Sequence, residues 1–376
     1  MTNTTSNGEK SHMESVTRPA SDSPPSERWT ISPERYRQVV FVAGVLLALI
    51  VLTGAAVRLT ESGLGCEDWP TCNDDQVVPE WQFHSWIEFG NRLLSGVVAA
   101  GVGAAALAAY RRRPRNQQLI RLAWGLVAGV IAQVLLGAAT VLLDLHPLVV
   151  GLHFLLSMLL LWNATVLWVK ADPQLDQPDI APTSSAHTPE SSTATLATTD
   201  QLAPALTQER LHPVSRTVMT LAAVAMILGT LVTGTGPHSG DARADRLPFD
   251  LETIARIHSG AVWLFLASAA WLAYGLHRLV GQSQAHAQSH TQSRTQSQIQ
   301  SHTRAAAAAR YLLVAAVSQG AIGYTQFLTG VPALLVELHI LGAIVVWVCV
   351  VLLDQRVRQI RIEVASPTTD NAPSLA

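Results

Sequence analysis

Residues 319–339 read QGAIGYTQFLTGVPALLVELH, and residues 133–153 read QVLLGAATVLLDLHPLVVGLH. In each stretch a glutamine is followed four residues later by a glycine and then by a proline-containing break. A histidine stands 20 residues after the glutamine in both and opens a new apolar run. Together these shared features favour an internal duplication. Duplicated halves are a known membrane-protein architecture, so the repeat draws attention to two equivalent intramembrane histidines.

The chain of 376 residues is 49% hydrophobic and 14% charged, and its apolar residues form long runs. A helix needs about 20 apolar residues to cross the hydrocarbon layer, where helices satisfy their own backbone amides. We therefore predict an all-α membrane protein. The sequence contains no basic patch with interleaved aromatic residues, so nothing in it points to a nucleic-acid partner. Eight runs are long enough to span, at about 38–57, 87–110, 119–142, 148–169, 214–235, 254–280, 307–328 and 333–354.

Arginine clusters fall on alternate connections between these runs, whereas the connection 59–86 is acidic and has no Lys or Arg. By the positive-inside rule the arginine-rich connections are cytoplasmic. Eight transmembrane helices then leave both the N- and C-termini cytoplasmic, with 59–86 external. Four spans per half is an even number, so we predict two four-helix bundles in the same orientation, a parallel repeat.

The halves are separated by polar segments. We expect a disordered cytoplasmic tail, two four-helix halves joined by a cytoplasmic linker, and a second tail, at 1–34, 35–170, 171–213, 214–356 and 357–376. Residues 281–305 are predicted to form a low-complexity cytoplasmic loop. His286, His290 and His302 fall in this loop, where a solvated spacer is favoured over metal binding. The N-terminal segment lacks the apolar stretch of a cleavable signal peptide, so the first run is expected to be an uncleaved anchor.

Polar residues recur near the external ends of the even-numbered spans. They are Asn91, His153, His258 and His339. Aligning IEFGNRLLSG with IARIHSGAVW puts Asn91 opposite His258. Neutral imidazole is a good iron ligand, and two histidines at one depth suit the axial positions of a heme. The alternative is that each histidine bonds a backbone carbonyl or interfacial water.

Other polar residues share that depth. Glu88 lies on the same helix face as Asn91 and could transfer protons, or it could be a glutamate favoured by the helix N-terminus. Arginines near the same ends are candidate partners of heme propionates, with snorkelling as the alternative. They are Arg58, Arg92 and Arg256.

Two cysteines, Cys66 and Cys72, lie in the external connection, where oxidation is permitted. A disulfide that clamps this loop is favoured over a redox-active pair or a transient metal or heme hand-off. The third cysteine, Cys349, lies within an apolar run, as a small core residue does.

The run GAAVRLTESGLGCEDWPTC (54–72), followed by WIEFGNRLLSG (86–96), resembles the heme A synthase family. This resemblance implies a membrane oxidoreductase that converts the C8 methyl of heme O to the formyl of heme A for cytochrome oxidase biogenesis. It also implies a resident heme b in the C-terminal half and the substrate heme in the N-terminal half.

The resemblance extends to single residues. It implies that His258 and His339 are the axial ligands of heme b, that His153 faces the substrate heme, and that Glu88 is the essential catalytic acid. Cys66 and Cys72 would be the paired external cysteines.

One residue departs from the family pattern, because many members have histidine where this chain has Asn91. An amide is a poor iron ligand, so the N-terminal site has at most one strong axial ligand, His153. Either an iron position stays open or Asn91 has a hydrogen-bonding role in substrate heme binding. His84, seven residues earlier, is a less favoured substitute.

Two other functions compete with this one: a bis-histidine b-type cytochrome that carries electrons without substrate chemistry, and a parallel-repeat transporter. The resemblance implies heme O as substrate and an electron donor as partner. Heme O synthase, cytochrome oxidase assembly factors and a second copy of the chain are further candidate partners. The expected location is a bacterial-type plasma membrane.

Overall fold

The computed structural model describes residues 1–2, 30–72, 76–175, 208–289 and 293–365, and its helices belong to one compact unit that begins at Ile31. Within these residues eight α-helices form and no strand does. Their bounds are α1 Pro33–Leu59, α2 Phe83–Arg111, α3 Gln117–Leu142, α4 Pro147–Lys170, α5 Gln208–Thr235, α6 Leu251–Ser289, α7 Ser293–Leu328 and α8 Ala333–Ala365, with a short 3-10 turn, η2, at Pro173–Leu175.

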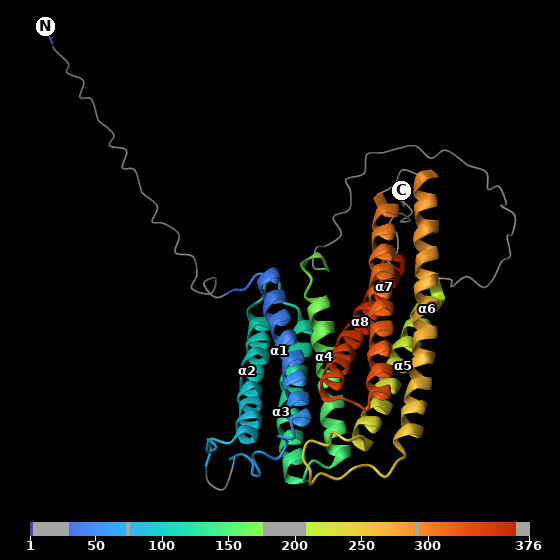
Figure 1. Cartoon of the computed structure of the whole chain (residues 1–376). Helices are drawn as coiled ribbons and strands as arrows, with labels where there is room; N and C mark the ends of the chain where they lie inside the picture. Colours follow the sequence, from blue (N-terminus) through green and yellow to red (C-terminus); the bar gives the residue numbers. More distant parts are fainter. Residues whose placement is uncertain (3–29, 73–75, 176–207, 290–292, 366–376) are drawn as a thin grey trace. The chain divides into compact units, whose positions relative to one another are not determined.

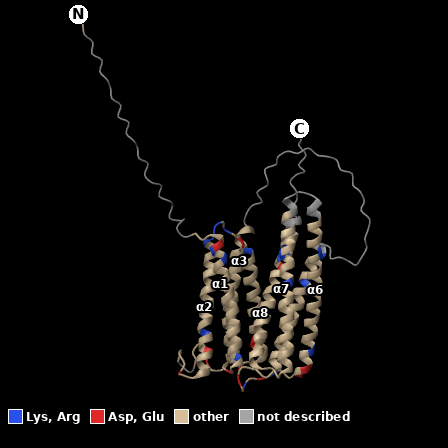
Figure 2. Ribbon diagram, turned by 45° about the horizontal axis from the view of Figure 1, so that its top comes forward, with Lys and Arg blue, Asp and Glu red and all other residues tan. Residues whose placement is uncertain are grey.

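All eight helices are long and apolar enough to cross a membrane. Most of the ribbon is formed by uncharged residues, and many of the charged residues lie toward the ends of the helices (Figure 2). The chain is therefore a multi-pass membrane protein, as its apolar runs predict. The connections α1–α2, α3–α4 and α5–α6 lie at one end of the helices, at the bottom of Figure 1.

Local sequence signals explain where helices begin and end. Ser32 caps α1 by accepting a hydrogen bond from the backbone N–H of Arg35, and a proline follows at the first position, where its missing N–H costs nothing. The two proline-containing breaks of the repeat become tight turns. Left-handed residues build both turns, Asp144 and Leu145 in the first and Gly330 and Val331 in the second.

The helices of each half close into a ring. In the first half α1 packs on α2 and α4, and α3 packs on the same two helices. The second half repeats this pattern with α5 to α8, so α2 and α4, like α6 and α8, lie diagonally across their bundles. The halves meet through α4 and α8, flanked by the equivalent pairs α4–α5 and α1–α8. This exchange symmetry confirms the predicted parallel repeat of two four-helix bundles.

The predicted cytoplasmic loop 281–305 differs from the structure, because α6 continues to Ser289 and α7 begins at Ser293. His302 is not part of a solvated spacer: it is 5% exposed and its Nδ1 lies 2.9 Å from Ser283 Oγ. The alanine run at 305–309 is strongly helix-forming, and α6 packs on α7, so both helices extend past the apolar runs. The side chains of His286 and His290 lie outside the described residues.

The helices at the edges of the two halves also extend beyond the predicted limits. Helix α1 begins at Pro33, α5 begins at Gln208 and α8 continues to Ala365, so each helix exceeds its predicted half. The remainder of both predicted tails and of the linker, at 3–29, 176–207 and 366–376, lies outside the described residues.

Candidate functional site

Each of the four predicted polar positions lies against a glycine of the preceding helix. A Cβ built on that glycine would come within 4 Å of the facing side chain in every case. Because glycine has no Cβ, the facing ring or amide can approach the helix backbone closely. We call each such pair a glycine seat. The nearest distances are 3.9 Å for Gly54 to Asn91, 3.3 Å for Gly137 to His153, 3.2 Å for Gly229 to His258 and 2.9 Å for Gly323 to His339.

The glutamines of the repeat also have equivalent contacts. Gln133 Nε2 donates to the backbone carbonyl of His153 at 3.2 Å, and Gln319 Nε2 donates to that of His339 at 2.6 Å. A second contact joins Gln133 Nε2 to Ser157 Oγ at 2.5 Å. The offset of 20 residues thus places a glutamine on one helix where it fixes the backbone of the histidine on the next.

The C-terminal half carries His258 on α6 and His339 on α8, two helices that lie diagonally across the bundle. His258 Nδ1 lies 2.9 Å from the carbonyl of Ala225. A carbonyl only accepts, so Nδ1 carries the proton and Nε2 keeps its lone pair. This tautomer is the one that metal-binding histidines adopt when a carbonyl fixes the second nitrogen.

The N-terminal half has the same framework with one change. Asn91 takes the position of His258, as the alignment predicts, and Thr53 Oγ1 donates to its Oδ1 at 2.8 Å. The imidazole across the bundle is His153 on α4. This site therefore has one imidazole and one amide. His84 is bonded to Ser62 Oγ at 2.9 Å at the start of α2 and does not join the glycine seats.

The donor set limits what these sites can hold. Within the described residues no group of three or more His, Cys, Asp or Glu side chains gathers as a metal site. Histidines on diagonally opposite helices, as His258 and His339 are, would fit a heme, whose iron takes its other four ligands from the porphyrin. The Nδ1 atoms of His153 and His339 are buried and have no hydrogen-bond partner among the described residues.

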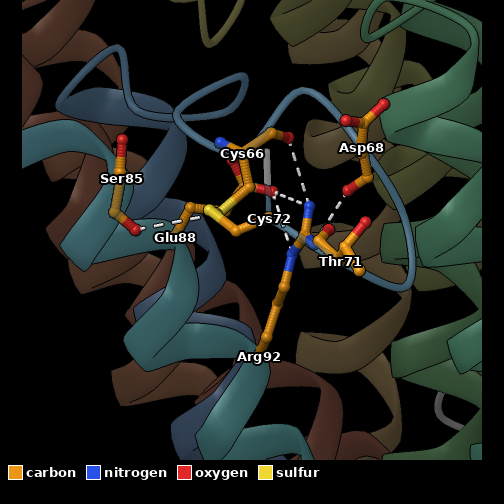
Figure 3. The surroundings of a disulfide bond; sticks show 7 residues. All are labelled: Cys66, Asp68, Thr71, Cys72, Ser85, Glu88 and Arg92. Carbon is orange, nitrogen blue, oxygen red and sulfur yellow. Dashed lines mark hydrogen bonds and ion pairs between the residues drawn. A yellow bond between two sulfur atoms is a disulfide. The ribbon is translucent and has the colours of Figure 1, made fainter. Parts of the chain in front are cut away.

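Glu88 is held beneath the loop closed by the disulfide Cys66–Cys72 (Figure 3). Its side chain is 8% exposed, accepts the backbone N–H of Cys66 at 2.8 Å and pairs with Arg92 at 2.6 Å. Burying a carboxylate is costly unless it is paired and hydrogen-bonded, and both conditions are met here. Glu88 therefore connects the disulfide loop to α2, one turn before the position of Asn91.

Arg92, a predicted candidate partner of a heme propionate, makes its contacts within the protein. All five of its N–H donors bond to protein atoms, two toward Glu88 and three toward backbone carbonyls of the disulfide loop. Those carbonyls belong to Cys66, Asp68 and Thr71, at 3.2, 2.9 and 2.9 Å. Arg92 is thus a clamp for the loop, and Figure 3 shows its guanidinium among these carbonyls.

The other two arginines differ from each other. Arg58 donates to the carbonyls of His238 at 2.5 Å and Thr233 at 2.9 Å, so it ties α1 to the second half. Arg256 has a side chain that is 77% exposed and pairs with Glu252 one turn away. Of the three, Arg58 alone is both partly buried and left with an unbonded guanidinium nitrogen, Nη1, in the described structure.

A connection between the halves was missed by sequence reasoning. The backbone N–H of Gly63 donates a hydrogen bond of 3.0 Å to the carbonyl of Gly240 in the α5–α6 loop. Arg243 of the same loop pairs with Glu67 at 3.1 Å, and hydrogen bonds to Asp241 and Glu67 raise its pKa. The mixed charge of this loop was visible in the sequence. The pairing of Arg243 with Glu67, 176 residues away, was not.

Two side chains near the glycine seats were also missed. Thr53, which holds Asn91, looks like any threonine in an apolar run. Glu337, two residues before His339, has a buried Oε2 atom without a partner. A carboxyl group inside an apolar run is a signal that could have identified it.

Fold and site together define a duplicated, multi-pass helical membrane protein in which each half carries two imidazole or amide side chains on glycine seats. A family model described as cytochrome oxidase assembly protein, COX15-CtaA, matches residues 37–85 and 78–351. The chain belongs to this family.

Individual relatives match over shorter segments. They are named heme A synthase and come from Symbiobacterium thermophilum (37% identical over 33% of this chain and 40% of the relative), Geobacillus kaustophilus (38%, 30% and 35%) and Lysinibacillus sphaericus (35%, 33% and 41%). The matched segments thus span less than half the length of these relatives.

Proposed function

We propose that this protein is a heme A synthase-like oxidoreductase that converts the C8 methyl group of heme O to the formyl group of heme A. The observation that carries the proposal is the pair of equivalent sites with different ligands. One has His258 and His339 on diagonally opposite helices, and the other has His153 and Asn91 in the equivalent positions. Such a difference is expected if one half holds a fixed cofactor and the other binds and releases a substrate. The names of the matched relatives support the reaction.

In the C-terminal half His258 and His339 would hold heme b, which supplies one-electron transfer when bound. The fit rests on the Ala225 carbonyl, which fixes the His258 tautomer, and on the Gly229 and Gly323 seats, which leave room for both rings. The apolar helices around the site exclude water, and exclusion of water tunes the potential of such a centre.

In the N-terminal half the substrate heme O would be bound through His153. Each of two successive hydroxylations of the C8 methyl would consume one dioxygen, two electrons from the donor and two protons, and would release one water. The geminal diol that results would lose water to leave the formyl group. Glu88 is the acidic group that we assign to this site. Its contacts with Arg92 and the Cys66 N–H fix its carboxylate oxygens, so it can accept and return a proton without reorientation.

The distribution of arginines supports cytoplasmic termini and an external disulfide loop, in a bacterial-type plasma membrane. An electron donor is required by the chemistry. A heme O-producing enzyme and cytochrome oxidase assembly factors would be partners on the supply and delivery sides. The α5–α6 loop, which belongs to the second half and bonds to the first through Gly240 and Arg243, would keep the two heme sites in register.

The proposal is tested by co-expressing the protein with a heme O-producing enzyme in a host without heme A, and by extracting the hemes. Heme A is expected with the natural chain. Glu88→Ala should retain heme b while heme A is lost. A preparation that contains heme b, never forms heme A and is unchanged by Glu88→Ala would instead support the b-type cytochrome. A preparation without any heme would support the transporter.

A further inference from the structure

The equivalence of Asn91 and His258 allows the two iron sites to be compared atom by atom. Both residues lie against a glycine of the preceding helix, Gly54 or Gly229. In the second half the Ala225 carbonyl anchors the imidazole at Nδ1 and leaves Nε2 free. In the first half the anchor is Thr53, which acts on the amide oxygen of Asn91.

The hydrogen bond from Thr53 determines which atom of the Asn91 amide is left for a bound heme. Thr53 Oγ1 lies 2.8 Å from Asn91 Oδ1, closer than it lies to the carbonyls of Leu49 (3.2 Å) or Ile50 (3.3 Å). The amide oxygen, the one atom of the group with lone pairs suited to a metal, therefore already accepts a hydrogen bond from the preceding helix through one of its two lone pairs. The remaining atom, Nδ2, has no available lone pair and only donates. It lies 3.9 Å from a Cβ built on Gly54.

We propose that the substrate iron has a single protein ligand, His153, and that Asn91 lines the opposite axial face as a hydrogen-bond donor without coordinating the metal. This inference rests on the proposed function, because it concerns heme O in the N-terminal half. One axial position of the substrate heme is then open to a small diatomic ligand, whereas heme b between two histidines has none.

An open iron position accounts for the presence of Asn91 in the first half at the position that His258 has in the second half. A heme with two imidazole ligands is suited to electron transfer, while an open distal position permits reaction with a small molecule. The distal donor then matters, because a hydrogen bond from Asn91 Nδ2 stabilises partial negative charge on a ligand bound there. The amide in place of imidazole thus separates a reactive site from a relay site.

The test uses the full-length protein purified with heme O and heme b, reduced anaerobically and exposed to carbon monoxide. CO should bind the heme O fraction and leave heme b unchanged. Asn91→Ala should still bind CO, but with a higher C–O stretching frequency because the donor is lost. Asn91→His should give a six-coordinate low-spin heme O that resists CO. Thr53→Val should shift the C–O stretch without a change in spin state.

Each result decides between the alternatives. A natural chain whose heme O is low-spin and inert to CO would overturn the inference, as would an Asn91→Ala variant with an altered coordination number. Heme O that binds CO but never yields heme A would support the inference and count against the proposed function. If heme O neither copurifies nor binds when added to the purified protein, both fail.

Discussion

Gly323 on α7 lies so close to the imidazole of His339 on α8 that a Cβ at residue 323 would be 2.9 Å from the ring carbon Cε1. Contacts this short force a neighbour to move. Gly323→Ala should therefore displace the ring and weaken heme b binding by about 1–3 kcal/mol, the usual cost of overpacking. Heme b content per polypeptide after purification measures the effect.

Gly320→Ala is the matched control, because nothing lies within 4 Å of a Cβ built on Gly320 in the same helix. Alanine is the better helix former by roughly 0.5–1 kcal/mol, so this variant should retain heme b and be at least as stable. Equal loss of heme b in both variants would show that the Gly323 contact does not determine the site.

Gln319→Leu should loosen the backbone at His339, because the 2.6 Å hydrogen bond from Nε2 to its carbonyl is lost. Such a bond contributes about 1 kcal/mol, and the change should appear in the midpoint potential and thermal retention of heme b. Gln133→Leu removes the equivalent bond at His153 and should leave heme b unaltered. A similar shift from both variants would argue against separate sites in the two halves.

Arg92→Lys should release the disulfide loop, since a single ammonium group cannot reach Glu88 and three carbonyls together. Charge-assisted hydrogen bonds contribute about 1.5–3 kcal/mol each. Cys66–Cys72 should then be reduced faster by dithiothreitol, as followed by thiol labelling. Arg256→Lys changes an exposed surface ion pair, and in this variant the Cys66–Cys72 disulfide should be reduced at the same rate as in the natural protein. Unchanged reduction in Arg92→Lys would show that the clamp does not protect the loop.

His258→Ala and His153→Ala should have opposite consequences. Loss of His258 would remove one of the two proposed ligands of heme b, so heme b should be lost. Loss of His153 should abolish binding of heme O while heme b stays in place. Heme extraction and chromatography distinguish the two outcomes, and retention of heme b in both His258→Ala and His339→Ala would contradict the ligand assignment.

The number of spans and the parallel repeat could be predicted because apolar length and alternating arginines are properties of short segments. The histidine at offset 20 from glutamine was visible as a pattern. Its physical cause, the bond between Gln319 Nε2 and the His339 carbonyl, needed the packing of α7 on α8. The helical extensions of α6 to Ser289 and of α7 from Ser293 were missed because their polar residues gave no apolar signal beyond the predicted runs.

The contacts of the arginines could not be predicted from the sequence. Arg92 reaches carbonyls up to 26 residues away and Arg58 carbonyls up to 180 residues away. Backbone carbonyls have no sequence signature, so a charge near an external helix end was equally consistent with a propionate. Thr53 was missed for the same reason, because only the approach of α2 to α1 shows that its hydroxyl holds Asn91.

The absorption spectrum of the purified full-length protein, recorded oxidised and reduced, tests the central claim most directly. Two opposed histidines, His258 and His339, predict a Soret band and the sharp visible bands of a reduced low-spin heme b. Natural protein should contain this heme without any added substrate. A folded preparation with no Soret band would contradict the assignment of the duplicated glycine seats to heme.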